Sequence, residues 1–178
     1  MIGWLPVLAI AVWWGIRLGT LGAVPFETGM TTGVLVHFAL LVAISLVYGF
    51  QSVDHVSLIH RFKHVLKPAV LYALLASASV VAFHHGVCAE LTALRKTERE
   101  RFIAQSLSDD AQFLALQSQD PGLAHLDRET AKERALQSLQ FQFNPTWHFT
   151  AALLMWMAAA LSTALFTAIL GQWLRAST

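Results

Sequence analysis

The sequence predicts an all-α integral membrane protein, a four-helix transmembrane bundle with an extramembrane helical hairpin between the third and fourth spans. Of the 178 residues, 56% are hydrophobic and only 13% are charged, whereas charged residues make up about 25% of an ordinary soluble domain. Most of the charges lie in one block between long uncharged stretches. A soluble domain of this length could not bury so many apolar residues, because small domains have too much surface for their volume.

Four stretches of the chain are long and apolar enough to be spans. The hydrocarbon core is about 30 Å thick, so a spanning helix needs roughly 20 mainly apolar residues. We predict spans at about residues 2–24, 33–50, 65–87 and 147–174, within a single membrane domain of residues 1–178. Pro68 suits the first turn of the third span, where its missing N–H would have no partner. Asn144 and Pro145 break the chain just before the fourth.

Residues 90–143 have a different character, because they are rich in Glu, Arg, Gln, Ala and Leu, which are good helix formers. Ser108, followed by Asp109 and Asp110, looks like a helix start, with the carboxylates complementing the helix dipole. Asp120-Pro121-Gly122 is a turn signal, and Asp127 is a plausible cap for the next helix. We therefore predict a helical extension of the third span, a turn and a returning helix. The alternative is a partly disordered loop.

The basic residues give two opposed signals for orientation. The short connection between the second and third spans carries Arg61, Lys63 and Lys67 against a single acid, Asp54. The positive-inside rule then places this connection and both termini in the cytoplasm. Four basic residues close to the other end of the third span argue for the opposite orientation: Arg95, Lys96, Arg99 and Arg101. We favour cytoplasmic termini, because short loops report topology best.

Small residues recur every four positions on three of the predicted spans, and such rows let membrane helices approach closely. The rows are Ala11, Gly15, Gly19 and Ala23; Ala69, Ala73 and Ser77, with Ala78, Ala82 and Gly86 beside them; and Ala159, Thr163, Thr167 and Gly171. They predict a compact bundle within one chain. The alternative is that a row faces another membrane subunit or a second copy of the chain.

Polar residues near the ends of the spans form a candidate ligand site. With alternating helix directions, the following fall near one membrane face: Arg17, His37, His84, His85, Glu90 and His148. Neutral imidazoles could hold a transition metal or haem, and Arg17 could pair with an anionic lipid headgroup or a quinone carbonyl. Alternatively, these side chains simply reach water at helix ends. Adjacent His84 and His85 point about 100° apart on a helix and would not easily share one ion, so metal and cofactor stay undefined.

Signatures of other functions are missing from the sequence. It contains no HExxH, no GxSxG and no phosphate-cradling glycine loop, which leans against an enzyme. No basic stripe with interleaved aromatic residues marks a nucleic-acid surface. Cys88 is the single cysteine, so an intramolecular disulfide is excluded.

Two segments carry a resemblance to a known family. They are VSLIHRFKHVLKPAVLYALLAS, residues 56–77, which leads into the third span, and FNPTWHFTAALLMWMAAALSTALFTAIL, residues 143–170, which covers the last span. With the order of spans, they resemble small four-pass bacterial inner-membrane proteins classed as a domain of unknown function. The resemblance implies a bacterial inner-membrane location. That family has no assigned activity, so it implies no site residues.

Three functions remain open from the sequence. The leading hypothesis is a non-enzymatic accessory or scaffold subunit in the lipid bilayer, whose helical loop binds a partner. The second is a protein that binds or transports a lipid, a quinone or a small solute through the polar layer. The third is a redox subunit carrying a metal or haem.

Overall fold

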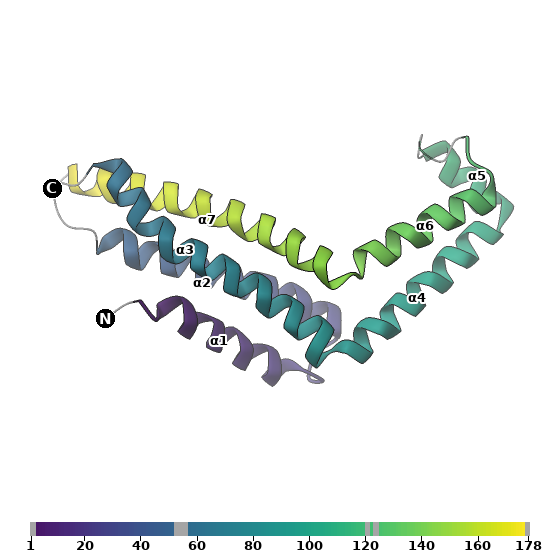
Figure 1. Cartoon of the computed structure of the whole chain (residues 1–178), viewed down its shortest axis with the longest axis horizontal. Coiled ribbons are helices and arrows are strands. Elements are labelled where there is room, and N and C mark those ends of the chain that lie inside the picture. Colours follow the sequence, from purple (N-terminus) through teal and green to yellow (C-terminus); the bar gives the residue numbers. More distant parts are fainter. Residues whose placement is uncertain (1–2, 52–56, 120–121, 123–124, 177–178) are drawn as a thin grey trace. The chain divides into compact units, whose positions relative to one another are not determined.

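The computed structural model describes residues 3–51, 57–119, 122 and 125–176 of the chain. All regular structure in this part is helical (Figure 1). The helices are α1 (Leu5–Thr20), α2 (Phe26–Phe50), α3 (Leu58–Val81), the π-helical segment η1 (Ala82–Val87), α4 (Ala89–Ser108), α5 (Asp110–Gln119), α6 (Arg128–Gln142) and α7 (Pro145–Ala176). They form two compact units. Unit 1 comprises Met1–Val80 with Thr150–Thr178, and unit 2 comprises Val81–Phe149.

Three helices in the described part of the chain are long and apolar enough to cross a membrane, which makes this a membrane protein. They are Phe26–Phe50, Leu58–Val87 and Pro145–Leu174. Helix α1 is also apolar but has only 16 residues. At 1.5 Å per residue it is about 24 Å long, a little less than the hydrocarbon thickness.

Two of the predicted spans begin earlier in the structure. Helix α2 begins at Phe26 instead of Gly33, and α3 begins at Leu58 instead of Val65. The hydropathy pattern underestimated both, because it locates the apolar stretch, whereas polar residues next to it can also be helical. Pro68 consequently lies inside α3 and not in its first turn, so that prediction was wrong.

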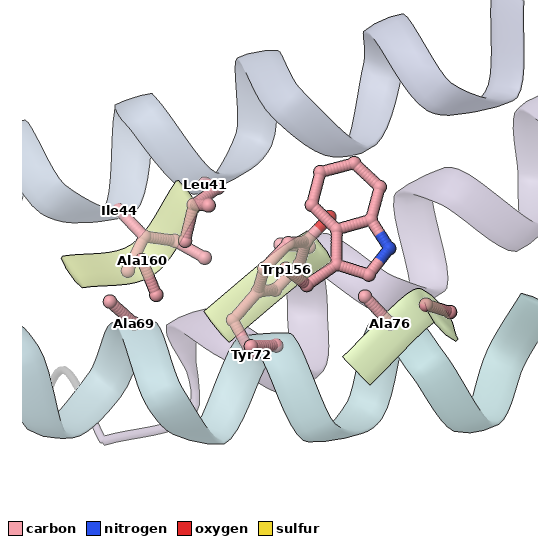
Figure 2. Packing of buried hydrophobic residues seen from close by; sticks show 10 residues of the cluster. Leu41, Ile44, Ala69, Tyr72, Ala76, Trp156 and Ala160 are labelled. Atoms are coloured by element: carbon pink, nitrogen blue, oxygen red, sulfur yellow. The ribbon is translucent and has the colours of Figure 1, made fainter. Parts of the chain in front are cut away.

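Unit 1 is held together by buried faces that repeat about every four residues. The buried face of α2 includes Gly29, Gly33, His37 and Leu41. Alanines on α3 and α7 pack against it together with Tyr72 and Trp156, as Figure 2 shows. Ala69, Ala73 and Ser77 are fully buried, so this predicted small-residue row does pack inside the chain. The row at Ala11, Gly15 and Gly19 is exposed instead.

Helices α2 and α7 approach closely at two glycines. A β-carbon on Gly49 would overlap the methyl group of Thr167. A β-carbon on Gly171 would lie 2.7 Å from Nη1 of Arg61 and 3.4 Å from the carbonyl oxygen of Gly49. Glycine is therefore required here by space, because larger side chains in a packed interior force neighbouring groups apart.

Unit 2 has a small apolar core of its own. Leu107 on α4, Phe113 on α5 and Ala131 on α6 are buried together, and α4 and α6 lie side by side (Figure 1). An ion pair between Arg128 and Asp110 links α6 to α5. This core explains why a segment with so many charges is helical, because tertiary packing stabilises helices more than propensity does.

The predicted helix starts at Asp109-Asp110 and at Asp127 are confirmed, whereas Ser108 is the last residue of α4. Oδ1 of Asp109 accepts hydrogen bonds from the amides of Ala111 at 2.8 Å and Gln112 at 3.2 Å. Asp127 accepts from the amide and the hydroxyl of Thr130 at 2.8 and 2.9 Å. These side chains satisfy amides that have no partner within the helix. The predicted turn at Asp120-Pro121 lies outside the described residues.

Candidate functional site

Unit 1 contains a cluster of aromatic rings around a buried histidine. We call Trp13, His37, Tyr72 and Trp156 the ring cluster; they come from α1, α2, α3 and α7. His37 is fully buried. Its imidazole stacks on the Trp13 indole with ring centroids 4.4 Å apart, and the Trp156 indole meets it edge-on at 5.2 Å. A titratable side chain thus sits where all four helices of the unit meet.

The hydrogen bonds within the ring cluster leave two buried nitrogens without a partner. Nδ1 of His37 lies 2.7 Å from the Tyr72 hydroxyl, whereas Nε2 of His37 and Nε1 of Trp156 have no hydrogen-bond partner among the described residues. If the phenol donates its proton to Nδ1, the neutral imidazole must carry its own proton on Nε2. The opposite arrangement would leave two groups unpaired, the phenol proton and the lone pair on Nε2, whereas the first leaves only the Nε2 proton. An unpaired buried polar group costs about 1–3 kcal/mol, so the first arrangement is favoured, with N–H groups at both Nε2 and Nε1.

Arg17 is buried on the same side of α2 as His37 but points away from it. A β-carbon on Gly33 would lie 3.1 Å from Cδ of Arg17, and one on Gly29 would lie 2.6 Å from Nη1. The side chain therefore runs along α2 from Gly33 towards Gly29. From Gly29 to His37 is eight residues, about 12 Å along a helix. The two glycines make room for Arg17, and the guanidinium lies well away from the imidazole.

A second buried arginine, Arg61, lies near the N-terminal end of α3. The sequence assigned it to a loop, but it belongs to the first turns of α3 and is only 3% exposed. It packs against Gly171 of α7. Its charge therefore does not act as a simple surface signal for orientation, and the topology inferred from the short connection loses part of its basis.

Unit 2 contains a histidine pair. Nε2 of His85 lies 2.8 Å from Nδ1 of His148, and the ring of His84 is 6.3 Å from that of His148, between centroids. His84 and His85 lie in η1, whose extra residue per turn alters the direction of side chains relative to an α-helix. Oγ1 of Thr92 donates to the backbone oxygen of His84 at 2.8 Å, which satisfies a carbonyl at this irregular point.

The predicted polar layer divides between the two units. Arg17 and His37 belong to unit 1, and His84, His85 and His148 belong to unit 2. Glu90 is exposed in the first turn of α4, where a carboxylate complements the helix dipole. The structure thus brings His84, His85 and His148 together. The single layer of these five residues and Glu90 stays a prediction. Within the described residues, no group of three or more His, Cys, Asp or Glu could hold a metal ion.

An apolar groove of about 510 Å³ lies between the helices of unit 2. We call it the α4–α6 groove; its lining residues are Phe102, Ile103, Ser106, Leu107, Gln112, Ala115, Leu116, Gln119, Ala131 and Ala135. Phe102 is 68% exposed at its edge. A groove of this size and composition is within the usual range for binding sites.

No family model, curated protein or solved structure matches the chain. Its candidate sites must therefore be weighed on their own geometry.

Sequence reasoning missed three members of the ring cluster and the burial of Arg61. Trp13, Tyr72 and Trp156 looked like ordinary apolar residues of predicted spans. One signal was present: Gly29, Gly33 and His37 recur every four residues on α2, so they share one helix face. Small residues on the face of an intramembrane histidine indicate that the face is packed against protein and not lipid.

Proposed function

We propose that the protein is a non-enzymatic accessory or scaffold subunit of a membrane assembly, which binds a partner protein through unit 2. The proposal rests on the α4–α6 groove. An open apolar groove between helices is suited to an amphipathic helix. The groove is lined mainly by apolar side chains, with Ser106, Gln112 and Gln119 among them, a composition that suits the apolar face and the flanking polar residues of such a helix.

The proposed architecture is a four-helix transmembrane bundle, in which the short helix α1 spans the membrane together with the three longer helices. In this architecture α4–α6 form a helical hairpin outside the membrane. The support is that α1 contributes Ala9 and Trp13 to the buried interior of unit 1, as a bundle member would. The charges on α4 and α6 are exposed for the most part, which suits water. The family resemblance supports a bacterial inner-membrane protein. The exposed Lys63 and Lys67 near the start of α3 support cytoplasmic termini by the positive-inside rule.

Binding at the groove is tested by two matched substitutions. Phe102 and Leu114 are similarly exposed, at 68% and 64%, but only Phe102 lines the groove. We expect Phe102→Glu to remove a partner that is crosslinked to the protein in gently solubilised membranes, and Leu114→Glu to retain it. Quantitative mass spectrometry of the crosslinked material measures both. Equal recovery of all proteins with the two variants would refute binding at the groove.

The orientation is tested by cysteine labelling. Cys88 is buried, so a Cys88→Ser background with Ser108→Cys places one exposed thiol at the end of α4. If the termini are cytoplasmic, a membrane-impermeant maleimide should label this thiol from the outer side of the inner membrane. Labelling only after the membrane is opened would reverse the orientation.

A further inference from the structure

The ring cluster contains two N–H donors that the protein itself does not satisfy. Tyr72 holds Nδ1 of His37, and the two remaining nitrogens, Nε2 of His37 and Nε1 of Trp156, are buried without a partner in the described residues. Both side chains are at most 2% exposed, and their rings are in contact. Inside a membrane protein no bulk water reaches such groups, so each strongly favours an acceptor.

We infer that the ring cluster is a binding site for a hydrogen-bond-accepting oxygen of a small, uncharged molecule. Two N–H donors on neighbouring rings suit one oxygen, which can accept from both. This oxygen is supplied by a bound water molecule or by the carbonyl group of a lipid-soluble compound such as a quinone. The rings of Trp13, Tyr72 and Trp156, from three helices, surround the His37 imidazole that carries one of these donors.

The surroundings of the site favour an uncharged molecule. Apart from His37, the side chains of the buried cluster around Tyr72 and Trp156 are apolar, among them Leu41, Ile44 and Ala76 (Figure 2). An ion without a counter-charge is very costly in such surroundings. The nearby cation, Arg17, directs its guanidinium towards Gly29, away from His37. The site is therefore distinct in its chemistry from the anion-binding layer that the sequence suggested.

A different arrangement would satisfy the indole donor of Trp156 without any ligand. The Trp156 and His37 rings meet at 61°, and an N–H group directed at an aromatic face gains a weak interaction. The two cases differ in their effect on the indole proton. Hydrogen bonding to oxygen shifts its resonance downfield, whereas the ring current above an aromatic face shifts it upfield.

The experiment is NMR spectroscopy of the full chain, labelled with ¹⁵N in lipid nanodiscs. Trp156→Phe assigns the indole N–H resonance, and Trp4→Phe, at an exposed position, is the matched control. If Trp156→Phe does not fold, the cross-peak between the indole proton and the His37 ring assigns the resonance in the unaltered protein. We expect a downfield indole proton. An upfield proton that shows no magnetisation transfer from water or from an organic molecule would overturn the inference.

The source of the oxygen is identified in the same samples. Magnetisation transfer from water to the indole proton identifies a bound water, provided that a short-chain benzoquinone does not change the indole resonance. A carbonyl ligand gives transfer from its own protons and is found in an organic extract of the protein. In that case benzoquinone should shift the Trp156 resonance, and His37→Gln should weaken the response at least several-fold. Either result supports the oxygen site, which does not depend on the proposed partner binding.

Discussion

Units 1 and 2 are both helical, but they are stabilised in different ways. In unit 1 the helices approach through alanine and glycine, and the buried polar side chains lie at the points of contact. In unit 2 the helices are capped by aspartates, carry most of the charges and share a core of a few apolar residues. In the proposed architecture this difference follows from the solvent: lipid gives apolar helices no hydrophobic reason to associate, whereas water would drive the burial of Leu107 and Phe113.

The largest effect is expected in the small core of unit 2. Phe113 is 8% exposed between α4 and α6, and a buried Phe→Ala substitution costs about 3–5 kcal/mol. Because few other apolar residues share this core, we expect Phe113→Ala to abolish hydrogen-exchange protection in α4–α6 and to leave that of α2 unchanged. The neighbouring Leu114→Ala, at an exposed position, should change stability by no more than about 0.5 kcal/mol. Equal losses in the two variants would show that Phe113 is not a core residue.

The next effect tests close packing in unit 1. Gly49→Ala places a β-carbon against the Thr167 methyl group, and such overpacking costs about 1–3 kcal/mol. Thermal unfolding in detergent should show the loss. Thr167→Ser in the same chain removes the methyl group but keeps the hydroxyl that donates to the Thr163 oxygen, so the double variant should recover most of it. Gly15→Ala is the control, since nothing lies within 4 Å of its β-carbon, and it should not destabilise.

The two units also differ in how far the sequence predicts them. The caps at Asp109 and Asp127 are local signals, in which a side chain bonds to amides two or three residues away, so the sequence was sufficient. The all-helical class and the apolar lengths follow from composition and periodicity in the same way. Helix boundaries were less accurate, because the polar residues at the start of α2 and α3 are compatible with either helix or loop.

The ring cluster could not be predicted in this manner. Contact between His37 and Tyr72 depends on the register of α2 against α3, and contact with Trp156 depends on α7. No local rule sets these registers; they follow from where glycine and alanine allow two backbones to approach. The sequence identified His37 as a candidate polar residue near one end of a span, but its burial and its neighbours are determined only by the packed structure.

A smaller effect is expected from a hydrogen bond between spans. Oγ of Ser45 donates to Oγ1 of Thr163 at 3.1 Å, joining α2 to α7. Such bonds contribute only about 0.6 kcal/mol on average in membrane proteins, because the same hydroxyl groups also find hydrogen-bond partners in the unfolded state. Ser45→Ala should therefore destabilise unit 1 by about that amount in an unfolding assay within lipid. The control is Ser162→Ala, which removes a hydroxyl that bonds only within its own helix. If Ser162→Ala lowers the stability as much as Ser45→Ala, the hydrogen bond between the helices does not contribute to stability.

The smallest effect concerns the cap of α6 and depends on pH. The backbone amide of Thr130, followed by its hydroxyl, lowers the pKa of the Asp127 carboxyl by hydrogen bonding to its charged form. A carboxyl with a lowered pKa in the folded state stabilises that state above its unfolded pKa of about 4. That stabilisation is lost as the pH falls through the lowered value. The amide proton shift of Thr130 should therefore titrate below the ordinary Asp range. Asp127→Asn keeps an acceptor oxygen without a titrating proton, so it should remove this transition and retain the cap; a transition that persists in the variant would assign it to another carboxyl.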